Sequence, residues 1–150
     1  MNSRFYRVAQ KLDAEELVQD RGAFFGSILE TLNHLIVADT IWLQRMAQHP
    51  SQFPSLRIVS DWLKPGALNQ ILVSDLPGWL ERRGKLDQII KQFVSEITSA
   101  DLESFLSYTT TEGTLNRKPF KNILLHFFNH QTHHRGQIST LLFRREWMLV

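Results

Sequence analysis

Residues 120–142 read FKNILLHFFNHQTHHRGQISTLL, and the apolar side chains in this stretch recur with the period of an α-helix. The apolar stripe consists of Phe120, Ile123, Leu124, Phe127, Ile138, Leu141 and Leu142. Pro119 stands just before it, and proline is tolerated in the first turn of a helix. The pattern therefore predicts a long last helix that begins near Pro119 and ends between Phe143 and Glu146.

Four of the six histidines of the chain lie inside this predicted helix, at His126, His130, His133 and His134. At 100° per residue, His134 faces the centre of the apolar stripe and His130 lies near it, whereas the other two point toward the flanks. His130 and His134 are thus one turn apart on the inward face, where two imidazoles can bind one ion. They can also be core histidines satisfied by hydrogen bonds, and the spacing alone leaves both interpretations open.

A divalent ion such as Zn²⁺ needs at least a third protein ligand, and His34 is the best candidate. It lies on a second apolar stripe of a helix predicted from about Phe24 or Ser27 to Ala47. Three imidazoles from two helices would leave one coordination position open, which is typical of catalytic sites. The string HQTHH lacks the Glu that acts as general base in zinc peptidases, so a peptidase mechanism is disfavoured.

The rest of the chain adds further helices and one hairpin. Ser3–Leu12 has helical spacing, Asp13 reads as a cap before another short helix, and a third long helix is predicted from Asp75 to about Ile97. The proline-containing stretch Gln48–Leu76 is long enough to be a crossover between helices. Residues 104–117 are rich in β-formers and predict a small hairpin. We therefore expect an all-α domain of four-helix-bundle type.

Length and composition set limits on the class of protein. The 150 residues suit one domain, 1–150, and the 17 basic against 15 acidic side chains give almost no net charge. Because the chain has no Cys, it forms no disulfide, no thiolate metal site and no cysteine nucleophile. There is no signal-peptide pattern and no window near the ~20 apolar residues of a membrane span. We expect a cytoplasmic protein without a membrane partner.

Basic residues gather toward the end of the chain, because no acid occurs between Glu112 and Glu146. That interval carries Arg117, Lys118, Lys121, Arg135, Arg144 and Arg145. A nucleic-acid surface is one interpretation. A solvated face balanced by acids elsewhere is the simpler one, since no nucleic-acid-binding motif accompanies these residues.

The string HFFNHQTHHRGQI at 126–138 resembles the last-helix motif of the DinB-like family, and LNHLIVADTIWL at 32–43 is similar to a motif on the family's second helix. The hairpin string YTTTEGT at 108–114 is also similar. The resemblance covers most of Leu32–Leu142 and implies a four-helix bundle with an up-down-down-up path. It implies a divalent ion, usually nickel or zinc, held by His34, His130 and His134. It also implies a bacterial protein that forms a homodimer.

Related branches of this superfamily include thiol-dependent transferases, so the resemblance implies a metal-dependent enzyme acting on a small-molecule substrate. Such an enzyme would be a transferase that uses a low-molecular-weight thiol, or a hydrolase. The thiol would come from a cosubstrate, because the chain has no Cys. The alternative is a stress-response module that binds a metal or ligand without turnover. A basic nucleic-acid-binding protein is the third hypothesis.

Several residues near the predicted ligands have two interpretations each. Asp39 matches the family motif and could orient an imidazole or stay solvated, and we expect it to pair with Arg135. Gln137 could hydrogen-bond at the site or fill space. Tyr108 could act as a proton donor in the pocket, or it could pack in the core or in a flap. His49, which precedes Pro50, is expected in solvent.

Both ends of the chain are short beside the family pattern. The first predicted helix, before Asp13, is brief, and the chain stops with RREWMLV instead of continuing in an apolar tail. This leaves open whether the chain is native or shortened.

Overall fold

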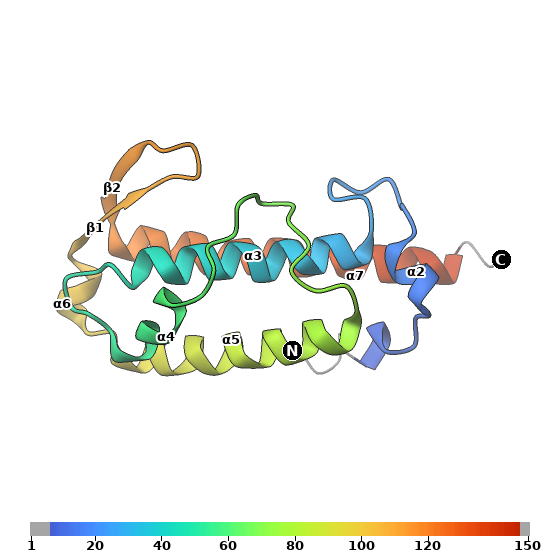
Figure 1. The fold of residues 1–150 in the computed structure, drawn as a ribbon, viewed down its shortest axis with the longest axis horizontal. Helices are drawn as coiled ribbons and strands as arrows, with labels where there is room; N and C mark the ends of the chain where they lie inside the picture. Colours follow the sequence, from blue (N-terminus) through green and yellow to red (C-terminus); the bar gives the residue numbers. More distant parts are fainter. Residues whose placement is uncertain (1–6, 148–150) are drawn as a thin grey trace.

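The computed structural model describes residues 7–147, with side chains as far as Leu142, and the chain is mostly helical (Figure 1). Its long helices are α3 (Ile28–Met46), α5 (Leu76–Glu96) and α7 (Phe120–Trp147). Helix α3 packs against both α5 and α7. Figure 1 shows α3 and α5 running in the same direction and α7 running in the opposite direction. Helix α3 is therefore the central element, as its two apolar stripes predict.

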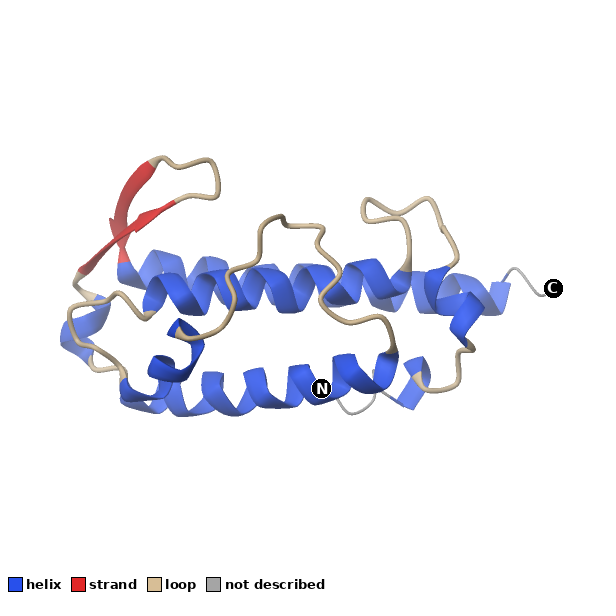
Figure 2. Cartoon of the chain, in the orientation of Figure 1, coloured by secondary structure: helices blue, strands red, loops and turns tan. Residues whose placement is uncertain are grey.

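Shorter elements connect the long helices (Figure 2). They are α2 (Ala14–Val18), the 3-10 turn Pro54–Leu56, α4 (Arg57–Ser60), α6 (Ser99–Leu102), β1 (Phe105–Thr109) and β2 (Leu115–Pro119). The two strands pair antiparallel, and Gly113 turns between them with φ +85°, so the predicted hairpin is confirmed. The predicted first helix, Ser3–Leu12, begins outside the described residues. The side chains of Arg144 and Arg145 also lie outside them.

The long helices begin where the sequence supplies caps. At the start of α3, the Ser27 hydroxyl accepts a hydrogen bond from the Glu30 amide, and the Glu30 carboxylate accepts one from the Ser27 amide. This capping box satisfies two backbone N–H groups that have no partner inside the helix. At the start of α5, Asp75 accepts from the amide of Gly78, and Pro77 occupies the first turn as predicted.

Residues 47–75 form a crossover from the end of α3 to the start of α5, and they pass in front of α3 (Figure 1). Asn33, a buried residue of α3, fixes this segment. Its side-chain oxygen accepts from the amides of Leu72 and Val73 at 2.8 and 3.0 Å, and its nitrogen donates to the Val73 carbonyl at 2.9 Å. One buried side-chain amide therefore anchors the crossover on α3, next to His34.

The core is built from the apolar faces of these helices. Its largest fully buried side chains include Trp79, Phe93, Phe120 and Phe127. They come from α5 and α7 and are covered by α3, as the helical periodicity predicts. Among residues 7–147, none of the helices combines the length and the apolar character needed to cross a bilayer.

A buried ion pair joins α3 to its neighbours. Asp39 is fully buried, and its carboxylate pairs with the guanidinium of Arg83 from α5. Gln131 of α7 donates to the same carboxylate at 2.9 Å and accepts from Arg135. The expected direct pair of Asp39 with Arg135 is therefore wrong, because Arg83 takes that place and Gln131 stands between them. Burial raises the pKa of Asp39, and Arg83 and Gln131 oppose that rise.

His49 also differs from the sequence expectation, because it is only 2% exposed. Its Nδ1 accepts from the Ser51 amide at 3.1 Å, so Nε2 carries the hydrogen and donates to the Ser104 hydroxyl at 2.7 Å. The ring packs against Phe53 and Phe120. His49 thus closes the end of the core where α3 meets α6 and the hairpin.

Replacing Arg83 by Met leaves the Asp39 carboxylate buried without its cation. We expect the free energy of unfolding to fall by about 3–5 kcal/mol, which is typical when one partner of a buried pair is removed. Urea unfolding monitored by circular dichroism measures this change. The matched control is Lys85→Met on the same helix, whose pair with Glu81 is exposed and should matter little. Equal losses in the two variants would contradict a structural role for the Asp39–Arg83 pair.

Candidate metal centre

Three imidazoles converge between α3 and α7. His34 comes from α3, and His130 and His134 come from successive turns of α7. The Nε2 atoms of His34 and His130 lie 3.1 Å apart, and one ring nitrogen from each of the three residues lies within 4.8 Å of the other two. The structure thus brings together the three histidines that the sequence analysis selected.

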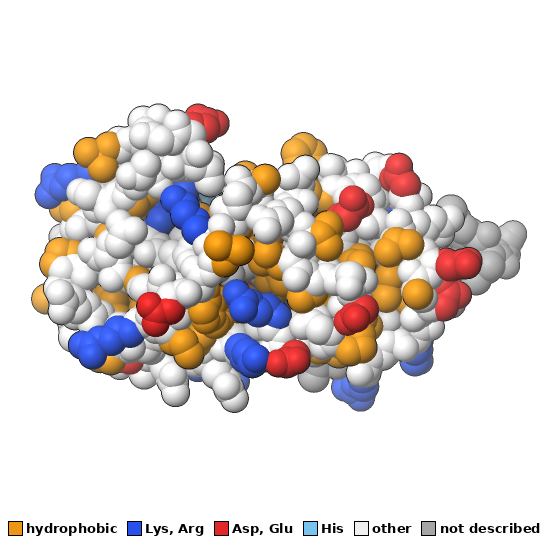
Figure 3. All heavy atoms as spheres, viewed as in Figure 1, with side chains coloured by type: hydrophobic (Ala, Val, Ile, Leu, Met, Phe, Trp, Pro, Cys, Tyr) orange, Lys and Arg blue, Asp and Glu red, His pale blue; other side chains and the backbone are white. Residues whose placement is uncertain are grey.

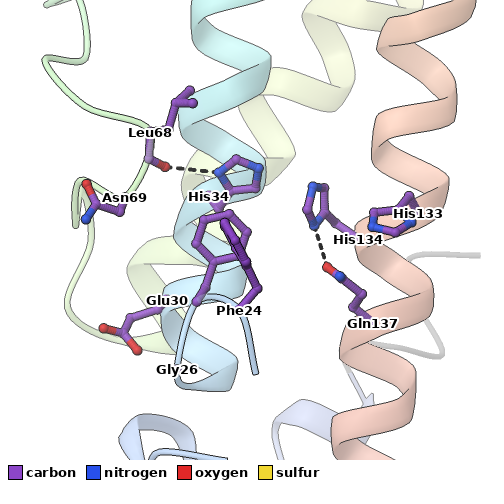
Figure 4. Close-up of a pocket in the computed structure, with 10 residues that line it drawn as sticks. Phe24, Gly26, Glu30, His34, Leu68, Asn69, His133, His134 and Gln137 are labelled. Carbon is purple, nitrogen blue, oxygen red and sulfur yellow. Dashed lines mark hydrogen bonds between the residues drawn. The ribbon is translucent and has the colours of Figure 1, made fainter. Parts of the chain in front are cut away.

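Hydrogen bonds fix which nitrogen of each ring carries its hydrogen. His34 Nδ1 lies 3.0 Å from the carbonyl oxygen of Leu68, which can only accept, so Nδ1–H donates and Nε2 keeps its lone pair (Figure 4). His134 Nδ1 lies 2.6 Å from Gln137 Oε1, which leaves its Nε2 free in the same way. The crossover and α7 therefore each turn one imidazole lone pair toward the space between the helices.

The electrostatics of the site keep the imidazoles neutral. Burial, with the neighbouring rings of His134 and His34, lowers the pKa of His130 to about 3. Burial also lowers the pKa of His34, against the Leu68 hydrogen bond, and the pKa of His134, against Gln137. Neutral imidazole is the form that coordinates metal ions, so the site is prepared for a cation at neutral pH.

The arrangement fits a divalent metal ion. Two nitrogens on a tetrahedral Zn²⁺, each at about 2.0–2.1 Å, lie about 3.3 Å apart. The 3.1 Å between the facing nitrogens of His34 and His130 is close to that separation. A set of three imidazoles suits Zn²⁺, Ni²⁺ and other borderline ions. Among the described residues this cluster of potential ligands contains histidines alone, so one coordination position or more is left for a small molecule.

A cavity of about 900 Å³ opens beside the three histidines. His34 and His134 form part of its wall, together with Phe24, Glu30, Asn69 and Gln137 (Figure 4). Its volume is in the range of small-molecule sites. A small molecule in this cavity would therefore lie against two of the three imidazoles.

The loop before α3 closes one side of this cavity. Phe25 stacks on the ring of His34, with centroids 4.0 Å apart and 23° between the planes. The loop turns at Gly26, whose φ of +78° suits glycine. A Cβ at Gly26 would lie 2.7 Å from the Glu30 carboxylate, so this glycine allows the close approach of loop and helix. The loop thus shields one face of His34 from water.

The remaining predicted residues fall in different places. Gln137 makes the hydrogen bond that was one of its two interpretations. Tyr108 does not line the cavity and packs with its ring 5.3 Å from that of Trp42, so the predicted pocket role is wrong and the core role holds. His133 is exposed at the cavity and lies outside the three-histidine group. Sequence reasoning missed Phe25 and the Leu68 carbonyl, and a backbone carbonyl has no sequence signal.

The comparisons with known proteins agree with the resemblance seen in the motifs. A family model described as the DinB family matches residues 1–144. Since the match spans nearly all of the 150 residues, the chain belongs to the DinB family. The comparison with curated proteins and the comparison with solved structures each give no match.

The low pKa of His130 predicts how the stability of the metal-free protein depends on pH. The folded chain holds His130 neutral down to about pH 3, whereas the unfolded chain protonates it near 6.5. The unfolded state therefore binds more protons between these values, and stability falls as the pH is lowered through that window. Urea unfolding in the presence of a chelator should show that His130→Gln loses less stability than wild type as the pH is lowered. His133→Gln, at an exposed position, should follow wild type, and three parallel curves would contradict the assignment.

Proposed function

We propose that the chain binds one divalent metal ion, nickel or zinc, through His34, His130 and His134. The observation that carries this proposal is the pair of Nε2 atoms 3.1 Å apart between two helices, with the third imidazole beside them. Membership of the DinB family and the neutral state of all three rings support it. The Leu68 carbonyl and the Gln137 amide hold two of the rings in the tautomer that coordination needs.

We propose further that the site is catalytic and transfers a thiol cosubstrate to an electrophilic small molecule. A bound divalent ion would lower the pKa of a thiol or a water molecule and so supply a nucleophile at neutral pH. The thiol must be a cosubstrate, because the chain has no Cys. A hydrolase that uses water instead is the related alternative.

The residues of the cavity would bind and orient the small molecule. Phe24 and Leu68 offer apolar surface, and Asn69 and Gln137 offer amide groups. Phe25 covers one face of His34 and limits access of water from that side. These features suit an uncharged body with a few hydrogen-bonding groups.

We also propose that the predicted first helix joins α3, α5 and α7 as the fourth helix of an up-down-down-up bundle. The parallel course of α3 and α5 and the return of α7 support this path (Figure 1). The long crossover between α3 and α5 supports it as well, since parallel neighbours need such a connection.

Metal content tests the first proposal. Protein purified without a His tag should contain close to one equivalent of nickel or zinc by elemental analysis, and His34→Ala, His130→Ala and His134→Ala should lose it. We expect affinity to fall by more than about 100-fold, since loss of an outer partner alone costs roughly 10–100-fold. The matched control is His133→Ala, next to His134 on α7. Loss of metal in His133→Ala with retention in His130→Ala would show that the ligand set is wrong.

Thiol consumption tests the second proposal. Metal-loaded protein should accelerate the loss of free thiol when a low-molecular-weight thiol is mixed with an aryl halide or an epoxide, and His134→Ala should not. Colorimetric thiol titration follows the reaction. A protein that holds metal but leaves every thiol and electrophile pair unchanged would support the stress-response binding module.

A further inference from the structure

A second cavity, of about 410 Å³, lies farther along α3, where the crossover and the hairpin approach each other. Its wall includes Ile41, Gln44 and Arg45 from α3, Trp62 and Lys64 from the crossover, and Thr109 from β1. Ile41 and Arg45 lie 7 and 11 residues after His34, on the same face of the helix. Arg45 is therefore about 16 Å from His34 along the helix axis, so this cavity is separate from the metal centre.

Positive charge is concentrated in this cavity. Its wall carries Arg45 and Lys64 and no carboxylate. A patch of basic side chains is visible on this face between the hairpin and the crossover (Figure 3). Arg82 does not belong to the wall, but its guanidinium lies 3.7 Å from the centre of the Trp62 ring. Asp61, the neighbour of Trp62 in sequence, is exposed and does not belong to the wall.

The cation of Arg45 is half-buried without an anionic partner. Among the side chains described for residues 7–142, no carboxylate pairs with Arg45 or with Lys64. The guanidinium of Arg45 lies 4.7 Å from the ring of Trp42 and 5.0 Å from that of Tyr108. Burial removes part of the hydration of this charge and so lowers the pKa of Arg45. An anion would offset that loss.

Gln44 contributes an unsatisfied acceptor in the same place. Its Nε2 donates to the carbonyls of Val59 and Trp62 at 3.0 and 2.8 Å, so the amide cannot turn over. Its Oε1 is buried and has no hydrogen-bond partner among the described atoms. The side-chain amide of Gln44 is therefore held in one orientation at the wall of the cavity.

We propose that this cavity binds a small organic anion, in which a carboxylate or phosphate group is attached to an aromatic or apolar body. The anionic oxygens would contact Arg45 and Lys64, and the fork of the Arg45 guanidinium suits either group. The body would lie against Trp62 and Ile41. The volume of about 410 Å³ is enough for a molecule of one or two rings. The proposal does not depend on the metal centre.

Binding of phenyl phosphate, benzoate and the neutral benzyl alcohol to the full-length protein tests this proposal by NMR. Both anions should shift the Trp62 indole N–H and the Gln44 side-chain amide in a saturable way, and benzyl alcohol should not. Trp62→Phe identifies the indole signal. Arg45→Gln and Lys64→Gln should each weaken binding about tenfold, as expected for loss of one charged hydrogen bond. The tighter of the two anions identifies the preferred group.

The controls separate a built site from general attraction to a basic surface. Lys91→Gln removes one exposed charge from α5 and should leave the affinity unchanged, as should His134→Ala. Lys64 is itself exposed, so Lys64→Gln tests the site without disturbing the packing of Arg45. The proposal is overturned if neither anion gives saturable shifts at about 10 mM. Equal weakening by Lys64→Gln and Lys91→Gln, or equal shifts with benzyl alcohol, would overturn it as well.

Discussion

The fold depends on the burial of polar side chains along α3. This helix is covered on almost every side, yet Asn33, His34 and Asp39 are at most 5% exposed. A buried polar group without a partner is costly, so each of them must find one on another element. Asn33 holds the crossover, His34 meets the crossover and α7, and Asp39 meets α5 and α7. Because each of these side chains needs a partner, their hydrogen bonds and ion pair set the positions of the elements around α3.

The candidate metal centre follows from this requirement. Asn33 fixes residues 72–73, the crossover then places the Leu68 carbonyl on His34, and that bond decides which nitrogen of His34 keeps a lone pair. On the other side, Gln131 ties α7 to Asp39 and brings His130 and His134 level with His34. The imidazoles are therefore held by residues that also stabilise the fold, and the arrangement needs little reorganisation before an ion binds.

Local periodicity explains what could be predicted from the sequence. The long helices, the hairpin and the inward pair His130 and His134 were predicted because each depends on spacing within one segment. His34 lies on another helix, and it was selected by its place on a second apolar stripe and by the family resemblance. The partner of Asp39 was predicted wrongly because it depends on which helix packs against α3, and Arg83 lies 44 positions away. His49 was expected in solvent because its burial depends on Ser104 and Phe120, which lie far along the chain. Leu68 acts through its backbone and leaves no trace in the sequence.

Glu30 has two roles, and this limits which substitutions the wall of the cavity can accept. The same carboxylate completes the cap of α3 and forms part of the cavity wall. A substitution there would also remove the hydrogen bond that Glu30 contributes to the capping box of α3. Asn69 lies on the exposed crossover and has no such second role among the described contacts. Substitutions that change the wall of this cavity therefore cost less stability on the crossover than on α3, so the wall can vary while the central helix stays the same.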